Sequence, residues 1–261
     1  MKIATWNING VRARLDGATA WLKDARPDIL CLQELKCEDA AFPAEVFGDL
    51  GYNVATRGQK GFNGVALLSK LPLDAVSRAL PGDGDDDQAR FVDAVVSVAG
   101  GAIRVASLYA PNGNPPGSDR FDYKLAWMAR LEAYAKARLA EEEAFVLAGD
   151  YNVIPEPIDV YNPAAWREDA LFRPESRAAF RKLVYLGLTD AFRALHPEPG
   201  QYSFWDYQRG AWERDNGLRI DHLLLSPQAA DRLTAAGIDK TPRGWDKPSD
   251  HTPVWCELAD G

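Results

Sequence analysis

Polar side chains that suit metal-assisted chemistry stand at the ends of four apolar runs in this chain of 261 residues. In chain order they are Asn7, Glu34, the pair Asp150 and Asn152, and the pair Asp250 and His251. A carboxylate or an imidazole beside a buried strand is costly unless it is paired or hydrogen-bonded. If the strand ends converge, the pattern predicts one polar cleft whose donors suit a divalent cation.

Such a cleft offers what phosphodiester hydrolysis needs, which is a cation to neutralise phosphate charge, an activated water and fixed donors for the transition state. Glu34 is the best candidate for a magnesium ligand, and Asn7 could add a carbonyl oxygen or hold a bound water. Asp150 is the candidate that orients or deprotonates the attacking water. His251 could act as acid, base or phosphate donor, with Asp221 as the carboxylate that fixes its tautomer.

Further polar groups could bind phosphate oxygens. Tyr109 and Asn112 supply a hydroxyl and an amide, and Asn152 supplies a second amide. Taken singly, each of these motifs more often has a structural explanation, since a Glu after a strand is usually solvated and Asn-Gly is usually a turn. On a strand, His222 would point away from the face of the preceding Asp221, so we do not assign it to the site.

Composition narrows the class of protein. Hydrophobic residues make up 46% of the chain and aromatic residues 10%, which permits a sizeable core. No run of about 18 apolar residues is present, so we expect no membrane span. Three cysteines without framework spacing and a start without an apolar signal core indicate a cytoplasmic protein in a reducing compartment. We expect Cys31 and Cys256, which lie in apolar runs, to fill the core.

The net charge is -8 at pH 7, which by itself does not favour a polyanionic partner. Lysine and arginine nevertheless recur in three loops, 57–60, 209–219 and 240–247, whereas four aspartates gather at 83–87. These cations are consistent either with a solvated surface or with a face that binds a polyanion. In the second case the basic loops, with Lys60 and Arg209, should lie on the face of the site, and the acidic loop should lie outside the footprint.

Both strands and helices are expected. Short β-rich runs bounded by Gly, Pro or Asn predict strands at 3–8, 29–33, 52–56, 65–69, 91–98, 103–109, 144–149, 220–226 and 252–258. Apolar spacings of three and four predict helices at 15–25, 119–142 and 175–186. Strands mixed with helices imply sheets covered by helices. Since no linker divides the chain, we expect a single domain over 1–261.

Two shorter signals concern the arrangement of these elements. Residues 3–9 and 105–112 both run from apolar residues into Asn, and each precedes an acid-bearing strand end, at Glu34 and Asp150. This echo suggests two similar halves that face each other. The Pro-rich segment 155–163 is short and closely follows Asp150, so we expect a loop of the site rather than a domain boundary.

Taken together and in this order, the motifs resemble those of the exonuclease III family of AP endonucleases, within the endonuclease/exonuclease/phosphatase superfamily. The resemblance runs nearly the length of the chain, through residues 6–10 (WNING), 33–36 (QELK), 61–66 (GFNGVA), 109–112 (YAPN), 149–152 (GDYN), 217–221 (GLRID) and 249–253 (SDHTP). The core acids and His251 are common to the superfamily. The segments QELK, YAPN and LRID point to the branch that acts in DNA repair.

The resemblance implies a fold and an activity. The fold is α/β, a four-layer αββα sandwich of two packed mixed β-sheets flanked by helices, as in deoxyribonuclease I-like enzymes. The activity is Mg²⁺- or Mn²⁺-dependent hydrolysis of the phosphodiester 5′ to abasic sites in double-stranded DNA. Actions at 3′ ends, as a 3′-5′ exonuclease and a 3′-phosphatase or phosphodiesterase, are also implied. We expect a monomer without an obligate protein partner.

The same resemblance implies roles for single residues. It places Glu34 and Asn7 on the metal and Asp150 on water activation. It also places Asp221 beside His251. In a scheme with two metal ions, further groups would approach the ion, namely Asp150, Asn152 and His251.

Other matches and two departures follow from the same comparison of motifs. Tyr109 and Asn152 match contacts to the phosphate or the transition state, and Asp250 matches a second or alternative metal position. Asn9 stands where some relatives carry Asp, so the resemblance does not decide whether Asn9 binds the metal. Residues 113–116 read Gly-Asn-Pro-Pro, where some relatives place an arginine that wedges into DNA.

Substrate selection is expected in the segment 202–220, where apolar and aromatic residues are crowded around basic ones. The candidates for lining a pocket are Phe204, Trp205, Trp212, Leu218 and Ile220. Aromatic residues at alternating positions could equally be core residues of strands. Alternatively, some of them line a small apolar pocket for a flipped deoxyribose, and a pocket too small for a base would select abasic sites.

Two rival functions remain open at this point. One is a phosphodiesterase or phosphatase of the same fold that acts on a lipid or inositol phosphate. It would need a membrane-facing apolar loop or a basic head-group pocket, and the sequence has no clear one. The other is a catalytically inactive DNA-binding homologue. Against it stands the full set of site residues, Asn7, Glu34, Asp150, Asn152, Asp221 and His251.

Overall fold

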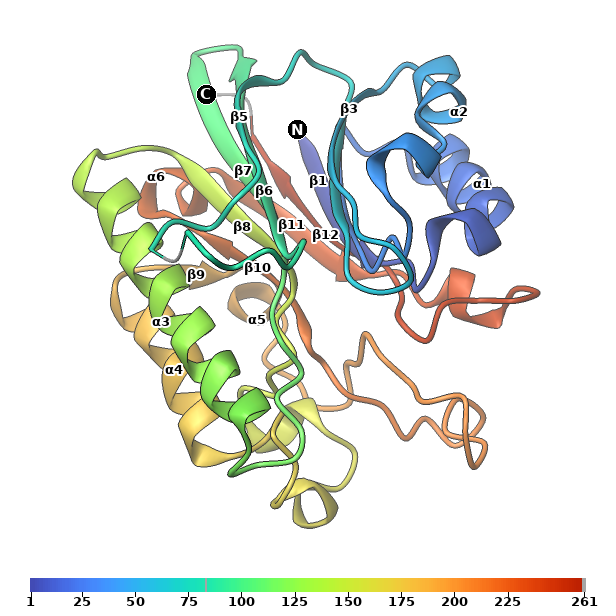
Figure 1. Cartoon of the computed structure of the whole chain (residues 1–261), viewed down its shortest axis with the longest axis vertical. Coiled ribbons are helices and arrows are strands. Elements are labelled where there is room, and N and C mark those ends of the chain that lie inside the picture. Colours follow the sequence, from blue (N-terminus) through green and yellow to red (C-terminus); the bar gives the residue numbers. More distant parts are fainter. Residues whose placement is uncertain (83, 260–261) are drawn as a thin grey trace.

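Two six-stranded sheets pack face to face in the computed structural model, which describes residues 1–82 and 84–259. Helices α1 (Leu15–Ala25) and α2 (Ala44–Asp49) cover the outer face of one sheet. Helices α3 (Asp119–Ala140) and α4 (Pro174–Tyr185) cover the outer face of the other (Figure 1). This αββα sandwich confirms the fold class expected from the sequence.

The first sheet has the strand order β11-β12-β1-β2-β4-β3. In that order the bounds are Leu233–Ile238, Val254–Leu258, Lys2–Asn7, Ile29–Gln33, Val65–Ser69 and Asn53–Arg57. Strands β1 and β2 are parallel, and the other neighbours are antiparallel. The parallel pair ends at a common edge, where Asn7 lies opposite Gln33 and Glu34 follows.

The second sheet has the strand order β5-β6-β7-β8-β10-β9. In that order the bounds are Asp74–Ser77, Phe91–Val98, Gly101–Tyr109, Phe145–Asp150, Asp221–Leu225 and Thr189–Asp190. Strands β7 and β8 are parallel and end with Tyr109 opposite Asp150. Strand β10 is antiparallel to β8 and begins at the same edge, with Asp221 also opposite Asp150.

The two sheets repeat one pattern of strand directions. Each has a parallel pair in the third and fourth positions, and every other neighbouring pair is antiparallel. In both sheets the second strand of the parallel pair leads into a carboxylate, at Glu34 and Asp150. The pattern agrees with the two similar halves suggested by the repeated apolar runs.

Apolar side chains fill three layers of the molecule. Between the sheets, the core cluster includes Cys31 and Cys256, which are buried and free of disulfide bonds, as expected. A second cluster joins α3 and α4 to one sheet through Trp127 and Phe180. A third joins α1 to the other sheet through Trp21. None of the helices in the described ranges combines the length and the apolar character needed to cross a membrane.

All nine predicted strands and all three predicted helices are present, with ends shifted by at most two residues. The sequence reasoning missed β5, β9 and β11, which are edge strands. An edge strand buries less apolar surface, so its signal is weak; β11 reads LTAAGI and β9 has two residues. It also missed the short helices α2, α5 (Ala191–Leu195) and α6 (Pro227–Ala230). The 3₁₀ helices η1 to η5 span Val11–Arg14, Asp39–Ala41, Pro157–Asp159, Pro163–Trp166 and Thr241–Gly244.

Candidate active site

Polar residues from both sheets meet at one edge of the sandwich. They come from the ends of β1, β2, β7 and β8, the start of β10 and the segment before β12, and are Asn7, Glu34, Tyr109, Asp150, Asp221 and His251. Four of them line a pocket of about 290 Å³, namely Glu34, Tyr109, Asp150 and His251. The polar cleft expected from the strand ends is therefore present.

The side chain of Asn7 joins the two sheets. Its amide nitrogen donates to Glu34 Oε1 at 2.9 Å and to Asp150 Oδ2 at 3.0 Å, although these carboxylates follow strands of different sheets. The amide oxygen accepts a hydrogen bond from the backbone N–H of Asn9 at 3.1 Å, and Asn7 is fully buried. The amide nitrogen of Asn7 thus faces both carboxylates and holds them in place.

Glu34, Asp150 and His251 form a cluster that fits a divalent cation, because one ligand atom of each lies within 4.8 Å of the others. Although burial opposes its ionisation, hydrogen bonds from Asn7 and Lys36 hold the pKa of Glu34 below its ordinary value. Burial raises the pKa of Asp150 above its ordinary value. A cation would stabilise the ionised form of both groups, so the electrostatics of the cluster also fit a metal.

Asp250 is not part of this cluster among the described residues. Its Oδ1 atom accepts a hydrogen bond from Asn9 Nδ2 at 2.9 Å. Asn9 also accepts a hydrogen bond from Lys36, whose Nζ lies 2.9 Å from Glu34 Oε2. Asp250 is therefore connected to Glu34 through Asn9 and Lys36, and it lines the same pocket next to His251 in the chain.

The imidazole of His251 is held by a carboxylate, as the sequence reasoning expected. His251 Nδ1 lies 2.8 Å from Asp221 Oδ2, which also accepts a hydrogen bond from the hydroxyl of Ser203 at 2.6 Å. His251 Nε2 lies 3.7 Å from Asp150 Oδ2, and the ring of Phe204 packs edge-on at 4.9 Å. Although burial opposes the charge, Asp221 and Asp150 raise the pKa of His251 to about 10. The ring is therefore an imidazolium at neutral pH.

The three predicted phosphate contacts, Tyr109, Asn112 and Asn152, line the same pocket. Burial and the charges of Glu34 and Asp150 raise the pKa of the Tyr109 hydroxyl well above its ordinary value, so this group stays a neutral donor. The amide nitrogen of Asn112 donates to Asn152 Oδ1 at 3.4 Å. The hydroxyl of Tyr109 and the amides of Asn112 and Asn152 thus line one pocket.

Two site residues have left-handed backbone conformations. The φ angle is 52° at Glu34 and 49° at Asn152, which is uncommon for residues other than glycine. The Glu34 carbonyl accepts the N–H of Gly10 at 2.7 Å, and the N–H of Asn152 donates to Asp150 Oδ1 at 2.8 Å. Such strain persists where the surroundings hold it in place, and it is common at functional sites.

The apolar side of the pocket agrees with the sequence reasoning only in part. Phe204, Leu218 and Ile220 line it. Trp205 does not, because it is fully buried and its Nε1 donates to Asp215 at 2.9 Å. Trp212 packs against Trp205 with ring centroids 4.9 Å apart, so both tryptophans have a packing role instead. Extended chain alternates its side chains, which turns Trp205 away from the face of Phe204.

Besides Asn114 and Asp206, three further residues of the pocket were missed, namely Trp166, Asp169 and Leu171. They lie at the end of η4 and just after it, beyond the Pro-rich segment 155–163 that was expected to form a loop of the site. The residues that line the pocket thus begin at Trp166, after the segment 155–163, so the site loop was predicted too early in the chain. No motif marks the residues that follow.

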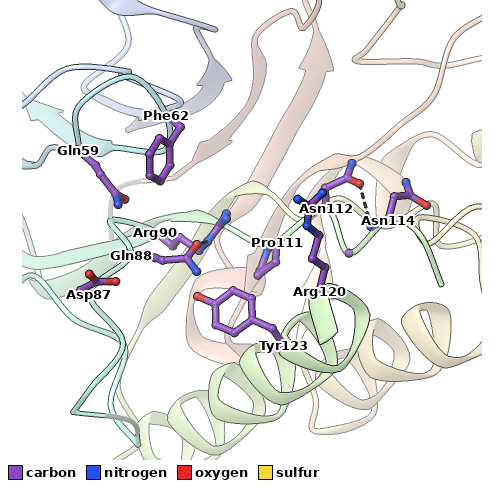
Figure 2. A pocket seen from close by; sticks show the side chains of 11 residues that line it. Gln59, Phe62, Asp87, Gln88, Arg90, Pro111, Asn112, Asn114, Arg120 and Tyr123 are labelled. Atoms are coloured by element: carbon purple, nitrogen blue, oxygen red, sulfur yellow. Dashed lines mark hydrogen bonds between the residues drawn. The ribbon is translucent and has the colours of Figure 1, made fainter. Parts of the chain in front are cut away.

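A second pocket, of about 580 Å³, adjoins the first at Asn112 (Figure 2). Arg90 and Arg120 supply its positive charge. Asp87, from the predicted acidic loop, lines it too, so this loop lies closer to the site than expected. Asp83, the first residue of that loop, lies outside the described residues.

Cations of two predicted basic loops, 209–219 and 240–247, line pockets of their own. Arg209 and Arg214 line a third pocket that shares Phe204 with the first. Lys247 is exposed and lines a pocket near the start of α1, and Lys60 is exposed as well.

Arg219 is an exception, and its assignment to a basic surface is corrected. It is buried, and its guanidinium forms ion pairs of 2.7 Å with both Asp159 and Asp190. The buried His222 lies against Arg219 and has its Nε2 atom 3.1 Å from the carbonyl of Val153, so it belongs to this internal cluster. His222 is outside the pocket, as expected.

Comparisons with known proteins agree with this geometry. A model of the endonuclease/exonuclease/phosphatase family matches residues 4–251. Exodeoxyribonuclease III of Haemophilus influenzae is 36% identical over 99% of this chain and 100% of its own length. An AP endonuclease structure from Archaeoglobus fulgidus has a TM-score of 0.93 and 39% identity, and a Neisseria 3′ phosphatase bound to a product DNA hairpin has 0.94 and 38%. Both similarities cover 99% of each chain.

The contact between Asp221 and His251 predicts the protonation of two buried histidines. In the metal-free protein, His251 should remain an imidazolium at pH 8, whereas burial and Arg219 lower the pKa of His222 to about 4 and keep it neutral. Asp221→Asn should move the pKa of His251 toward its ordinary value of about 6.5 and leave His222 unchanged. NMR titration of the imidazole resonances measures both values.

The same contact has a pH-dependent effect on stability. Because the pKa of His251 is higher in the folded chain, the contact stabilises the fold fully below about pH 6. This contribution is lost as the pH rises through about 10. A wild-type His251 that titrates near its ordinary value would contradict the assignment.

Proposed function

This chain belongs to the endonuclease/exonuclease/phosphatase family, and we propose that it is a metal-dependent DNA repair nuclease of the exonuclease III type. Its main reaction is hydrolysis of the phosphodiester 5′ to abasic sites, accompanied by 3′-5′ exonuclease and 3′-phosphatase or phosphodiesterase action. The cluster of Glu34, Asp150 and His251 in one pocket carries this proposal. It is supported by similarity to an exodeoxyribonuclease, an AP endonuclease and a 3′ phosphatase.

Mg²⁺ or Mn²⁺ is the cofactor that we propose. Glu34 and Asp150 would hold it through oxygen, the donor that both ions prefer, and Asn7 would keep the two carboxylates in place. His251 lies beside them but is not a ligand while its ring is protonated. Asn152 and Asp250, which line the same pocket, are the candidates for a second position. When bound, the ion would neutralise phosphate charge and lower the pKa of a bound water.

The chain's own groups have separate parts in the reaction. Asp150 would accept a proton from the attacking water, because its carboxylate lines the pocket beside the proposed ion. His251, kept protonated by Asp221, would donate from Nε2 to a phosphate oxygen and stabilise the charge of the transition state. Tyr109 and Asn152 would donate to the remaining phosphate oxygens.

Double-stranded DNA with abasic sites or free 3′ ends is the proposed partner. Phe204, with its apolar neighbours in the pocket, would contact a deoxyribose that has no base. Arg90, Arg120 and Arg209 line the adjoining pockets and would contact phosphates. We further infer a monomer that acts in the cytoplasm, since its free cysteines suit a reducing compartment.

The two rival functions fit these observations less well. A lipid or inositol phosphate is disfavoured because similar proteins that cover the chain almost completely are named for action on DNA or its abasic sites. A DNA-binding homologue without catalysis is disfavoured because the two carboxylates and the imidazole lie together with their hydrogen-bond partners.

Cleavage of a duplex with one abasic site, in Mg²⁺ and in EDTA, tests the proposal. Glu34→Ala should abolish most Mg²⁺-dependent cleavage, because it removes a charged ligand, while the fold stays intact. The matched control is Glu38→Ala, which removes an exposed carboxylate from the same segment and should leave the rate unchanged. Near-wild-type turnover of Glu34→Ala would refute the metal assignment, and a wild type that cleaves nothing would refute the function.

Asp150→Asn and His251→Asn should each slow the chemical step on the order of 10²-fold or more, the scale for groups that move protons or stabilise a transition state. The double variant should lose far less than the product of the two effects, because both groups act on one transition state. Single-turnover rates on pre-bound DNA are the measurement. Losses that multiply would show that the two residues do not share a site.

Binding to an abasic duplex should weaken as salt rises, since each neutralised phosphate releases about 0.9 counterion. Lys60→Ala, Arg209→Ala or Lys247→Ala should each flatten the plot of log affinity against log salt. Lys23→Ala is the control, because this exposed lysine lies on the outer helix α1. An affinity that does not depend on salt would count against DNA and favour a small phosphorylated substrate.

A further inference from the structure

Lys124 is a buried lysine that has no part in the reaction described so far. It lies on α3, and its Nζ atom donates to the carbonyl of Asn152 at 2.5 Å and to the carbonyl of Asn112 at 3.1 Å. Burying an ammonium group is costly, and burial lowers the pKa of Lys124 to about 7. An apolar residue would avoid this cost, so the lysine needs an explanation beyond packing.

The two carbonyls belong to separate loops of the active site, one after β7 and one after β8. The N–H of Ala110 donates to the Asp150 carbonyl at 2.8 Å, and Asn152 Nδ2 donates to the Ala110 carbonyl at 2.9 Å. On the pocket side, Asn112 Nδ2 donates to Asn152 Oδ1 at 3.4 Å. Lys124 adds two hydrogen bonds to this network. When the amine is protonated they are charge-assisted, and such bonds are stronger than those between neutral groups.

The local backbone is built around the Lys124 side chain. Gly113 has a φ of 86°, and a Cβ atom there would lie 2.6 Å from Cδ of Lys124. Only glycine therefore leaves room for the lysine stem at this position. Asn152 has a left-handed φ of 49°, which is costly for a residue with a side chain, and its carbonyl receives the shorter bond from Lys124.

We propose that Lys124 is a positioning residue, whose ammonium group fixes the two loops so that the amides of Asn112 and Asn152 face the phosphate together. Lys124 does not line the pocket, so it acts through these two residues and not on the substrate. Its effect on catalysis rests on the proposed function. Its effect on the loops rests on the geometry alone.

Lys124→Met keeps the apolar stem and removes the ammonium group. On the abasic duplex with Mg²⁺, kcat should fall on the order of 10- to 100-fold, because a small misplacement of catalytic groups has that effect. The KM should stay within about threefold, because Lys124 itself does not line the pocket and reaches the substrate only through the two amides. Lys136→Met is the matched control, because this lysine is exposed on the same helix. An unchanged kcat in Lys124→Met would overturn the positioning role and leave the proposed function standing.

A double variant separates positioning from a general loss of stability. If Lys124 acts through Asn152, then Lys124→Met with Asn152→Ala should be about as slow as Asn152→Ala alone. Losses that multiply would overturn the coupling.

A second pair of variants tests the same contact should Lys124→Met fail to fold. Gly113→Ala should lower kcat in the same way, because its methyl group would meet Lys124. Gly117→Ala should keep full activity, since Gly117 has a similar φ of 77° but open space around it. Equal activities for these two alanine variants would contradict the proposal.

Hydrogen exchange tests the loops without any activity. In Lys124→Met, the amides of residues 110–114 and 150–153 should exchange at least about 10-fold faster than in Lys136→Met, because local opening becomes easier. Unchanged exchange would overturn the proposal even if the protein were not a nuclease. A wild type without Mg²⁺-dependent cleavage would overturn the proposed function instead.

Discussion

The hydrogen bonds from Asn7 to Glu34 and Asp150 are the constraint on which the site depends, because they join the edges of the two sheets. The two carboxylates follow strands of different sheets, so the packing of the whole sandwich sets their separation. Protein interiors are close-packed and transmit small shifts. A change in the core between the sheets would therefore move the two carboxylates relative to each other, even though it lay far from the pocket.

Buried charges of opposite sign stabilise one another throughout the site. The imidazolium of His251 lies between Asp150 and Asp221, and Lys36 lies beside Glu34. Three carboxylates thus face two cations, and the remaining negative charge is what a divalent ion would neutralise. Since an unpaired buried charge is costly, the groups that hold the metal and those that hold the histidine depend on each other.

Strands with apolar residues on both faces were predictable from the sequence, and so were the polar residues that follow them, such as Glu34 and Asp150. The side that a residue faces was harder to infer. Phe204 and Trp205 are neighbouring aromatic residues, and the course of the backbone decides that Phe204 faces the pocket and Trp205 faces the core. Lys124 could not be recognised either. Its burial comes from two loops distant in the sequence, and on a helix a lysine ordinarily indicates a solvated face.

The pairing of β1 with β12 has a consequence for how the chain is made. Trp6 Nε1 donates to the carbonyl of His251 across 245 positions, and the register pairs Thr5 with Val254. On a ribosome, β1 emerges long before β12, and its edge stays open until that late strand is released. His251 is delivered in the same late segment. A nascent chain that stops short of it lacks both the strand that pairs with β1 and the imidazole of the site.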